Sequence, residues 1–269
     1  MAEISPIRVA DLREVSAQTG FDARLIAKDY QVTLLLYLLR AVPGLHFKGG
    51  TALQKTLLSY ARLSEDIDFT VTMPISDVRA SVETKVQESG FFAKITKDKD
   101  VEGFLRLVVH YDSPPDRRDT VFIDLNSRAK LLFQPQQRNV PHFYPGHIPA
   151  FNISTLDTRE MIAEKVAAAI GRNQPRDHFD IYQIIKHKLP IDLTLVRKKC
   201  EASGEEFSII RMFNNARKLK NRWDEDLLPL IREEVTFETV MRMLAKHFGL
   251  AKEKARLAKR HGRPSVRSA

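Results

Sequence analysis

Residues 47–71 read FKGGTALQKTLLSYARLSEDIDFTV, and this stretch decides the fold prediction. A glycine pair follows an apolar run, and further on Asp66 and Asp68 flank a single isoleucine. Because side chains alternate along a strand, both aspartates are expected on one face, with Ile67 and Phe69 directed into the core. Two neighbouring carboxylates repel each other unless a cation lies between them. The spacing therefore predicts a divalent cation at Asp66 and Asp68.

A third carboxylate comes from the later run TVFIDLN, residues 120–126, which alternates in the same way. If this strand neighbours the strand of Asp68, Asp124 lies about 5 Å away across the ladder. Three carboxylates on one sheet face form a hard-oxygen site suited to Mg²⁺, or to Mn²⁺ in its place, with substrate phosphates completing the shell. We therefore predict Asp66, Asp68 and Asp124 as the metal ligands.

The glycine pair lies between the apolar GLHF and the helix-like ALQKTLLSYA, which predicts the order strand, turn, helix. Glycine lets the backbone approach a phosphate closely, and a helix N-terminus offers N–H groups, although a glycine pair alone is also typical of a tight turn. Together with the aspartates, the pair predicts a triphosphate cradle. Arg62 precedes a strand, where an arginine is as often part of a surface ion pair. The expected phosphate contacts in this region are Lys48, Gly49, Gly50, Thr51, Arg62 and Ser64.

The composition of the sequence changes beyond residue 130, where a connector rich in proline and histidine precedes a series of predicted helices. The patterns predict helices at 22–42, 75–90, 157–170, 176–188, 205–222 and 236–260, and strands at 91–98, 104–112 and 120–126. We therefore predict an α+β fold. Residues 1–150 would form an α/β domain with a mixed sheet flanked by helices, and residues 151–269 a helical domain with a basic tail.

The composition narrows the class of partner. The formal net charge of +9 and the pI near 9.6 favour an anionic partner. Cys200 is the single cysteine, which excludes an internal disulfide or a cysteine zinc cluster and fits a reducing compartment. No stretch is long and apolar enough for a signal peptide or a membrane span. We expect a cytoplasmic protein without a membrane partner.

Four motifs carry a resemblance to a known family. GGTALQK followed by RLSEDIDF resembles the AbiEii/AbiGii toxin family of bacterial abortive-infection and type IV toxin–antitoxin systems, within the nucleotidyltransferase superfamily that includes DNA polymerase β. AEK at 163–165 and RDHFDIY at 176–182 resemble its third and fourth motifs, and AKDY at 27–30 resembles its K-D-Y helix. The resemblance covers residues 25–185. It implies a nucleotidyltransferase fold, an Mg²⁺-dependent phage-defence toxin with an NTP as substrate, and an antitoxin encoded nearby.

The third and fourth motifs add a lysine and two acids. Asp177 and Asp180 are three residues apart and so share one helix face, and Lys165 belongs to the preceding helix. Lys165 could neutralise a triphosphate while the acids hold its ammonium, but an ion pair that only packs the helices fits the spacing equally well. The resemblance implies that both motifs are essential. The expected catalytic residues are Asp66, Asp68, Asp124, Lys165, Asp177 and Asp180, with Lys165 also among the phosphate contacts.

The resemblance implies transfer of a nucleotide from an NTP to an RNA 3′-end, with the tRNA acceptor end as the expected acceptor and a block of translation as the result. Asp124 would share a second metal or accept the proton of the attacking hydroxyl. The basic residues expected to contact RNA also suit a solvated helix surface. They are Lys218, Lys220, Arg222, Lys254, Arg256, Lys259, Arg260 and Arg263.

Two other functions stay open at this point. A nucleotidyl- or phosphotransferase with the same fold could modify a protein instead of an RNA. A non-catalytic basic RNA-binding module is the second alternative, and the acids argue against it because carboxylates facing RNA without a metal would repel it.

Overall fold

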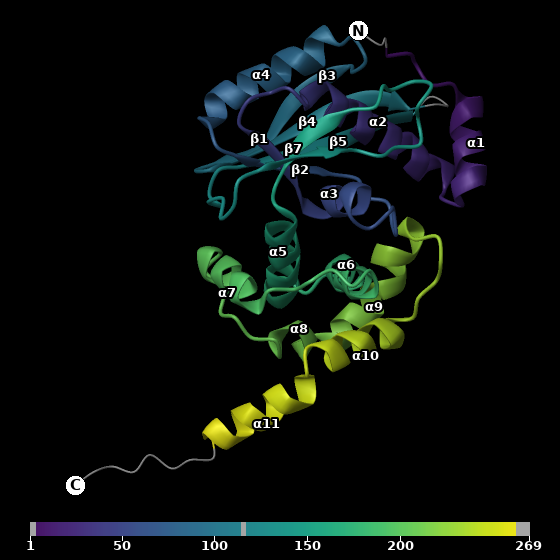
Figure 1. The fold of residues 1–269 in the computed structure, drawn as a ribbon. Helices are drawn as coiled ribbons and strands as arrows, with labels where there is room; N and C mark the ends of the chain where they lie inside the picture. Colours follow the sequence, from purple (N-terminus) through teal and green to yellow (C-terminus); the bar gives the residue numbers. More distant parts are fainter. Residues whose placement is uncertain (1–3, 114–116, 262–269) are drawn as a thin grey trace. The chain divides into compact units, whose positions relative to one another are not determined.

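The computed structural model describes residues 4–113 and 117–261 and divides the chain into two compact units (Figure 1). The sheet unit comprises Met1–Met161 and Pro229–Arg232, and the helical unit comprises Ile162–Leu228 and Glu233–Ala269. The predicted α+β class is confirmed. We placed the boundary at residue 150, whereas the units divide after Met161, because strand β7 (Asn152–Thr155) still pairs in the sheet.

The sheet unit contains a mixed sheet, which within the described residues has seven strands in the order β3-β4-β5-β2-β1-β7-β6. β2 pairs antiparallel with β1 and parallel with β5, so the strands of the two predicted acid runs are neighbours. The elements are α1 (Val9–Thr19), α2 (Ala23–Leu39), β1 (Leu45–Lys48), α3 (Gly49–Thr56), β2 (Ile67–Val71), α4 (Ile75–Glu88), β3 (Lys94–Val101), β4 (Phe104–Ser113), β5 (Arg117–Asn126), β6 (Gln136–Asn139), β7, and the start of α5 (Thr158–Gly171).

The two faces of the sheet differ in polarity. Along β4 and β5 every second residue is buried, as Leu105, Leu107, Ile123 and Leu125 show, and the residues between them are half-buried. Helices α2 and α4 contact each other, and they contact β5 and β3, respectively. The alternating apolar side chains thus form one face of the core, and the polar residues of the same strands lie on the opposite face.

Local sequence signals explain where the helices of this unit begin. Asp22 caps the N-terminus of α2, since its carboxylate accepts the backbone N–H of Arg24 at 2.8 Å. α3 begins at Gly49 without an intervening turn and ends at Thr56, before Ser59 and Tyr60 adopt positive φ. The predicted connector also contains β6, whose polar sequence QQRN carries no strand pattern, and β7 lies just beyond it, in the predicted helical domain.

The helical unit differs from the prediction in two places. The expected helix 205–222 is a short α8 followed by α9, because the chain leaves helical geometry at Asn215. The expected helix 236–260 is broken at Gly249, which has φ +60° and so suits a helix end. The elements are α5, α6 (Pro175–Lys186), α7 (Leu193–Ala202), α8 (Arg211–Asn214), α9 (Ala216–Leu227), the 3₁₀ turn η1 (Leu228–Leu230) at the unit boundary, α10 (Phe237–His247) and α11 (Leu250–His261).

In the part of the chain that the structure describes, no helix combines the length and the apolar character needed to cross a membrane.

Candidate functional site

The glycine turn packs directly against one of the predicted metal ligands. β1 ends at Lys48, which pairs with Asp68 in the β1–β2 ladder, and α3 begins at the next residue. Gly49 has φ +77°, and a Cβ at this position would lie 2.1 Å from Oδ2 of Asp68. Any side chain would therefore collide with the carboxylate, so the close approach of turn and aspartate requires glycine.

The second glycine lies against two further predicted phosphate contacts. A Cβ on Gly50 would lie 2.8 Å from Nη2 of Arg62 and 3.3 Å from Oγ of Ser64. Arg62 is only 2% exposed and donates from Nη1 to the carbonyl of Leu63 at 2.9 Å, so it does not belong to an exposed surface pair. The structure thus brings Gly50, Arg62 and Ser64 together.

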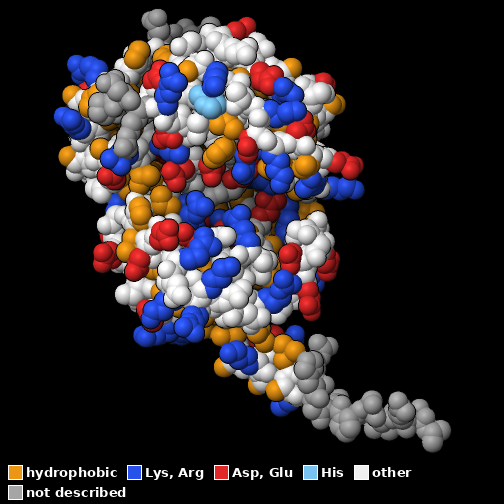
Figure 2. Space-filling view, turned by 180° about the vertical axis from the view of Figure 1, so that it is seen from behind, with side chains coloured by type: hydrophobic (Ala, Val, Ile, Leu, Met, Phe, Trp, Pro, Cys, Tyr) orange, Lys and Arg blue, Asp and Glu red, His pale blue; other side chains and the backbone are white. Residues whose placement is uncertain are grey.

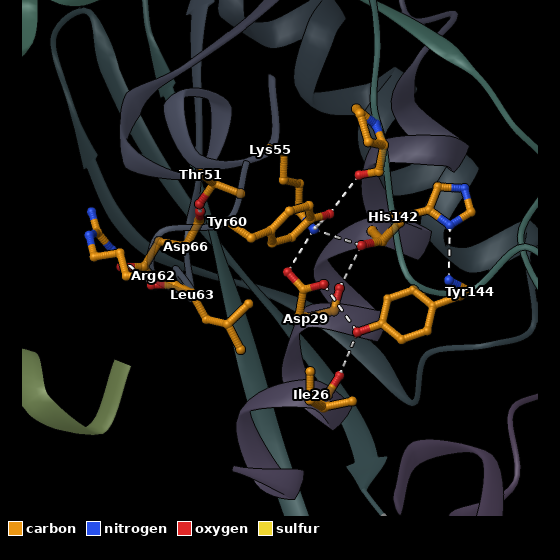
Figure 3. Close-up of polar contacts among 12 residues, drawn as sticks. Ile26, Asp29, Thr51, Lys55, Tyr60, Arg62, Leu63, Asp66, His142 and Tyr144 are labelled. Atoms are coloured by element: carbon orange, nitrogen blue, oxygen red, sulfur yellow. Dashed lines mark hydrogen bonds and ion pairs between the residues drawn. The ribbon is translucent and has the colours of Figure 1, made fainter. Parts of the chain in front are cut away.

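Thr51 connects the helix start to the aspartate run. Its hydroxyl donates to the backbone carbonyl of Asp66, and the side chain is buried (Figure 3). Asp66 immediately precedes β2, whose first residue is Ile67. The bond uses the backbone of Asp66 and not its carboxylate, so Thr51 holds the turn against the start of β2.

Asp68 and Asp124 are direct neighbours across the β2–β5 ladder, as the sequence predicted for adjacent strands. Directly opposed residues in a ladder point to the same face of the sheet, so both half-buried carboxylates lie on its polar face. The charge of Asp66 also reaches this face of the sheet, because it is among the causes that raise the pKa of Arg106, a neighbour of Asp124.

Arg106 is a site residue that the sequence reasoning missed. Its Nε and Nη2 bind Oδ1 and Oδ2 of Asp124, both at 2.7 Å. The hydrogen bonds to Asp124, followed by the charges of Asp124 and Asp66, raise the pKa of Arg106 although burial opposes this. The alternation of FLRLVVHY places Arg106 outside the core, but only the register of β4 with β5 reveals its partner.

The three predicted metal ligands do not form a ready three-carboxylate site. Across residues 4–113 and 117–261, no three His, Cys, Asp or Glu side chains lie close enough together to hold a metal. Both oxygens of Asp124 are engaged by Arg106. Asp66 and Asp68 also interact with other residues of the chain, so a cation at either carboxylate would replace existing contacts. Mg²⁺ accepts one or two carboxylates together with substrate phosphates, so a cation here would take most of its ligands from a bound nucleotide.

A buried ion pair anchors the other end of α3, and it joins two of the segments that carry the family resemblance. Lys55 of GGTALQK places Nζ 2.6 Å from Oδ1 of Asp29, which belongs to AKDY. The same Nζ donates to Oγ1 of Thr33 at 2.9 Å and to the hydroxyl of Tyr60 at 3.1 Å. Lys55 and Asp29 are each only 2% exposed (Figure 3). All three ammonium protons of Lys55 therefore have acceptors.

Two tyrosine hydroxyls link this network to the connector. The Tyr60 hydroxyl donates to the carbonyl of Pro141 at 2.6 Å, and the Tyr144 hydroxyl lies 3.1 Å from Oδ2 of Asp29. Burial, followed by the charge of Asp29, raises the pKa of both hydroxyls well above the usual value, so both stay protonated. The network thus holds α2, α3 and the connector together.

The third and fourth motifs form a separate buried cluster in the helical unit. Nζ of Lys165 lies 2.9 Å from Oδ1 of Asp177 and 2.9 Å from Oδ2 of Asp180. Arg172 donates from Nε and Nη2 to the two oxygens of Asp177, at 2.7 and 2.8 Å. The two acids are 1% and 0% exposed. The predicted meeting of Lys165 with both acids is confirmed, and with Arg172 the cluster is balanced in charge.

Asp177 is expected to make the helical unit less stable as the pH falls into the acid range. Burial would raise its pKa, but the charge of Lys165 and the bonds from Arg172 outweigh burial and lower it from 3.8. A carboxyl group with a lowered pKa stabilises the fold above its unfolded pKa, and this contribution is lost as the pH falls. Between pH 5 and pH 3 we expect the free energy of unfolding to fall by about 1 kcal/mol more in wild type than in Asp177→Asn.

Urea titrations followed by the fluorescence of Trp223 measure this difference, since the single tryptophan lies in the helical unit. Glu225→Gln, at an exposed position of α9, is the control and should keep the wild-type pH dependence. Equal slopes in wild type and Asp177→Asn would contradict the prediction.

A polar hollow lies along α8 and α9. Its volume is about 380 Å³, and the residues that line it are Asn214, Asn215, Arg217, Lys218, Asn221 and Arg222. Figure 2 shows Lys and Arg side chains gathered on one face of the helical unit. Two of the predicted RNA contacts are already paired, Lys220 with Glu238 and Arg222 with Asp226. Arg217 and Lys218 form no ion pair with any carboxylate in the described ranges.

The other predicted RNA contacts lie on α11 or beyond it. Lys254 and Lys259 are exposed, and Arg256 is 3.5 Å from Glu253. The side chain of Arg260 and all of Arg263 lie outside the described residues.

Two solved structures share the fold of this chain. MenT4, a nucleotidyltransferase toxin from Mycobacterium tuberculosis, is 19% identical with a TM-score of 0.68, over 89% of this chain and 88% of that chain. JHP933 from Helicobacter pylori is 18% identical with a TM-score of 0.55, over 90% of this chain and 99% of that chain. At such identities the likeness shows the fold alone.

The family assignment comes from the sequence. A search among curated proteins found no significant match. A family model described as nucleotidyl transferase AbiEii toxin, type IV TA system, matches residues 39–245, which include the glycine turn, the aspartate run and both helical motifs. The chain therefore belongs to the AbiEii family of nucleotidyltransferase toxins from type IV toxin–antitoxin systems.

Proposed function

We propose that this protein transfers a nucleotide from an NTP to an RNA 3′-end, with the acceptor end of tRNA as the preferred target and a block of translation as the consequence. The observation that carries the proposal is the packing of the Gly49 turn against Asp68, with Asp124 directly across the ladder. A backbone turn suited to phosphate binding thus lies against Asp68, a proposed metal ligand, and near Asp124, the proposed proton acceptor. Family membership supports a toxin nucleotidyltransferase.

Different residues of the sheet unit have separate roles in the proposed reaction. The N–H groups at the start of α3 and the ammonium of Lys48 bind the triphosphate. Asp66 and Asp68 hold Mg²⁺, or Mn²⁺ in its place, and when bound the ion polarises the phosphoryl group and offsets its negative charge. Asp124 accepts the proton of the attacking 3′-hydroxyl.

The remaining predicted phosphate contacts mainly support the glycine turn. Thr51 and Arg62 are buried and hold the turn in place, and Ser64 lies at its edge. We also propose that Lys165, held between Asp177 and Asp180, supplies a positive charge for the triphosphate, as the family resemblance implies. An ion pair that only packs the helices is the alternative. Loss of transfer in Lys165→Met at temperatures well below the melting temperature of the variant would favour the first.

For RNA binding we propose the hollow on α8 and α9. Phosphate contacts dominate RNA affinity, and cations without a protein partner gain most from them. We expect Arg217→Ala, Lys218→Ala to weaken tRNA binding and to reduce the slope of log K against log salt by about one to two. Filter binding at several salt concentrations measures both quantities.

The control for this prediction is Arg211→Ala, Lys220→Ala, which removes the same charge from two residues of the helical unit that do not line the hollow. Because both residues already pair with acids, we expect a smaller loss of affinity. Equal losses in the two double variants, or none in either, would show that the hollow is not the RNA surface.

The partners of the proposed enzyme follow from its family and substrates. A type IV toxin implies a cognate antitoxin, which we propose is encoded nearby. NTPs and tRNA are cytoplasmic, so we place the reaction in the cytoplasm.

The experiment that tests the function is incubation of the protein with Mg²⁺, each α-³²P-labelled NTP in turn, and total bacterial RNA, followed by a denaturing gel. We expect label in a band of tRNA size, with the NTP that gives it identifying the base. Label on protein alone would favour the transferase that modifies proteins. Tight RNA binding without label from any NTP would favour a non-catalytic RNA-binding module.

A further inference from the structure

Two phenylalanines lie on the polar face of the sheet, beside the candidate site. Along β5 this face carries Phe122, Asp124 and Asn126 in turn, because every second residue points to it. Along β4 it carries Arg106, which is opposite Asp124, and Phe104, which is opposite Asn126. The two rings therefore flank the ion pair between Arg106 and Asp124, each two residues along its strand from one member of the pair.

Each of these rings has a cation over it. The guanidinium of Arg106 lies 5.1 Å from the ring centroid of Phe122, and the ammonium of Lys99 on β3 lies 5.7 Å from that of Phe104. The side chain of Arg106 is 36% exposed and Lys99 is exposed, so this part of the face is open to solvent. Aromatic rings among cations on an open sheet face are a common platform for single-stranded RNA, because bases stack on the rings and phosphates bind the cations.

Phe104 is better placed than Phe122 to receive a base. The guanidinium over Phe122 is fixed by two hydrogen bonds of 2.7 Å to Asp124. The flexible side chain of Lys99 forms no ion pair within the described residues. A base can therefore displace the ammonium of Lys99 from the ring, and the ammonium can then bind the phosphate next to that base.

The segment after β5 adds polar groups beside Phe104. Asn126 accepts the backbone N–H of Arg128 on Oδ1 at 2.9 Å, which leaves its NH₂ group as a donor. Arg128 is exposed, and its Nε donates to the carbonyl of Glu102 at 2.7 Å. Because Glu102 and Asp98 are exposed acids in the same hairpin, the cations do not create a strong positive field. Stacking on Phe104 is therefore the main source of affinity that this surface offers.

The order of the strands indicates which substrate reaches Phe104. The glycine turn, where we place the triphosphate, follows β1, and Asp68 on β2 and Asp124 on β5 come next across the sheet. In phosphoryl transfer the attacking and the leaving oxygen lie in line, on opposite sides of the phosphorus. The attacking hydroxyl therefore arrives from the side of β5 and β4, where Phe104 lies.

We infer that the face around Phe104 binds the unpaired 3′-end of the acceptor RNA, with a base stacked on the Phe104 ring and with Lys99 and Arg128 on the neighbouring phosphates. This inference rests on the proposed function, because it takes RNA as the acceptor. It predicts that an acceptor has to end in unpaired nucleotides, so that a blunt duplex end is a poor substrate.

The test compares two fluorescently labelled RNA hairpins, one with an unpaired 3′ tail and one with a blunt end, in the absence of NTP and Mg²⁺. Fluorescence anisotropy should show that wild type binds the tailed hairpin about tenfold more tightly. Phe104→Leu should bind both hairpins with the wild-type affinity for the blunt one, and Phe104→Tyr should keep the preference. The control Phe207→Leu should also keep it, since Phe207 is a half-buried phenylalanine in the helical unit with Arg197 over its ring.

The variant Phe104→Trp reports stacking directly. The single tryptophan of the chain, Trp223, is buried, so any quenching beyond that of wild type comes from position 104. The tailed hairpin should quench this fluorescence and the blunt hairpin should not. In transfer assays Phe104→Leu should raise the KM for RNA and leave the KM for NTP unchanged.

Three results would overturn the inference. They are equal affinities of wild type for the two hairpins, a preference that Phe104→Leu retains or that Phe207→Leu loses equally, and a raised KM for NTP instead of RNA, which would assign the ring to the base of the NTP. A preference that depends on Phe104, in a protein that labels no RNA, would support the binding surface and refute the proposed reaction. Far-UV circular dichroism verifies that each variant is folded.

Discussion

An Asp66→Asn, Asp68→Asn double variant should lose nucleotide transfer by at least about 10³-fold in kcat. Asparagine keeps the shape of aspartate but removes the charge that holds a divalent cation. The turn itself should survive, because Thr51 binds the backbone carbonyl of Asp66 and because an asparagine in place of Asp68 would still fit against Gly49. The transfer of labelled nucleotide to RNA under single-turnover conditions measures the loss.

The chain offers a matched control for this variant. Asp98 and Asp100 on β3 form a second pair of aspartates with one residue between them, and both are exposed. Asp98→Asn, Asp100→Asn should therefore keep near wild-type transfer. If both double variants lost activity equally, the cause would be a general loss of negative charge, and the assignment of Asp66 and Asp68 would fail. Equal melting temperatures of the two variants separate catalysis from folding.

The parts of the site that the sequence predicted are those governed by local rules. Alternation along a strand places Asp68 and Asp124 outside the core, and the glycine pair before a helix marks the start of α3. The spacing of Asp177 and Asp180 sets them on one helix face. Each of these rules acts within one element, so a single sequence is enough to apply it.

The parts that the sequence did not predict depend on pairing between distant segments. Arg106 is 18 residues from Asp124 and Lys55 is 26 residues from Asp29, and nothing in either local pattern names its partner. Strand β6, QQRN, is polar and gains its structure from pairing with β7 in the sheet. The break at Gly249 was visible in the sequence, since glycine is typical of a helix end.

Replacing Lys55 by methionine should destabilise the sheet unit by about 3–5 kcal/mol. The change keeps most of the side-chain volume but leaves the carboxylate of Asp29 buried with only the Tyr144 hydroxyl near it among the contacts of Figure 3. Thr33 and Tyr60 also lose the donor that each accepts from. On a chain of this size the loss corresponds to a decrease in melting temperature of roughly 10 °C. Thermal melts followed by circular dichroism measure it.

A matched control and a second variant separate the buried charge from other causes. Lys220→Met makes the same replacement in an ion pair with Glu238, where the side chains are 61% and 52% exposed, and should leave the melting temperature close to that of wild type. Adding Asp29→Asn to Lys55→Met should recover part of the stability, because no unpaired charge then remains buried. A Lys55→Met variant as stable as Lys220→Met would disprove the role of the pair. Since Lys55 lies on the helix that begins at Gly49, we expect its loss to loosen the glycine turn and to lower transfer even below the melting temperature.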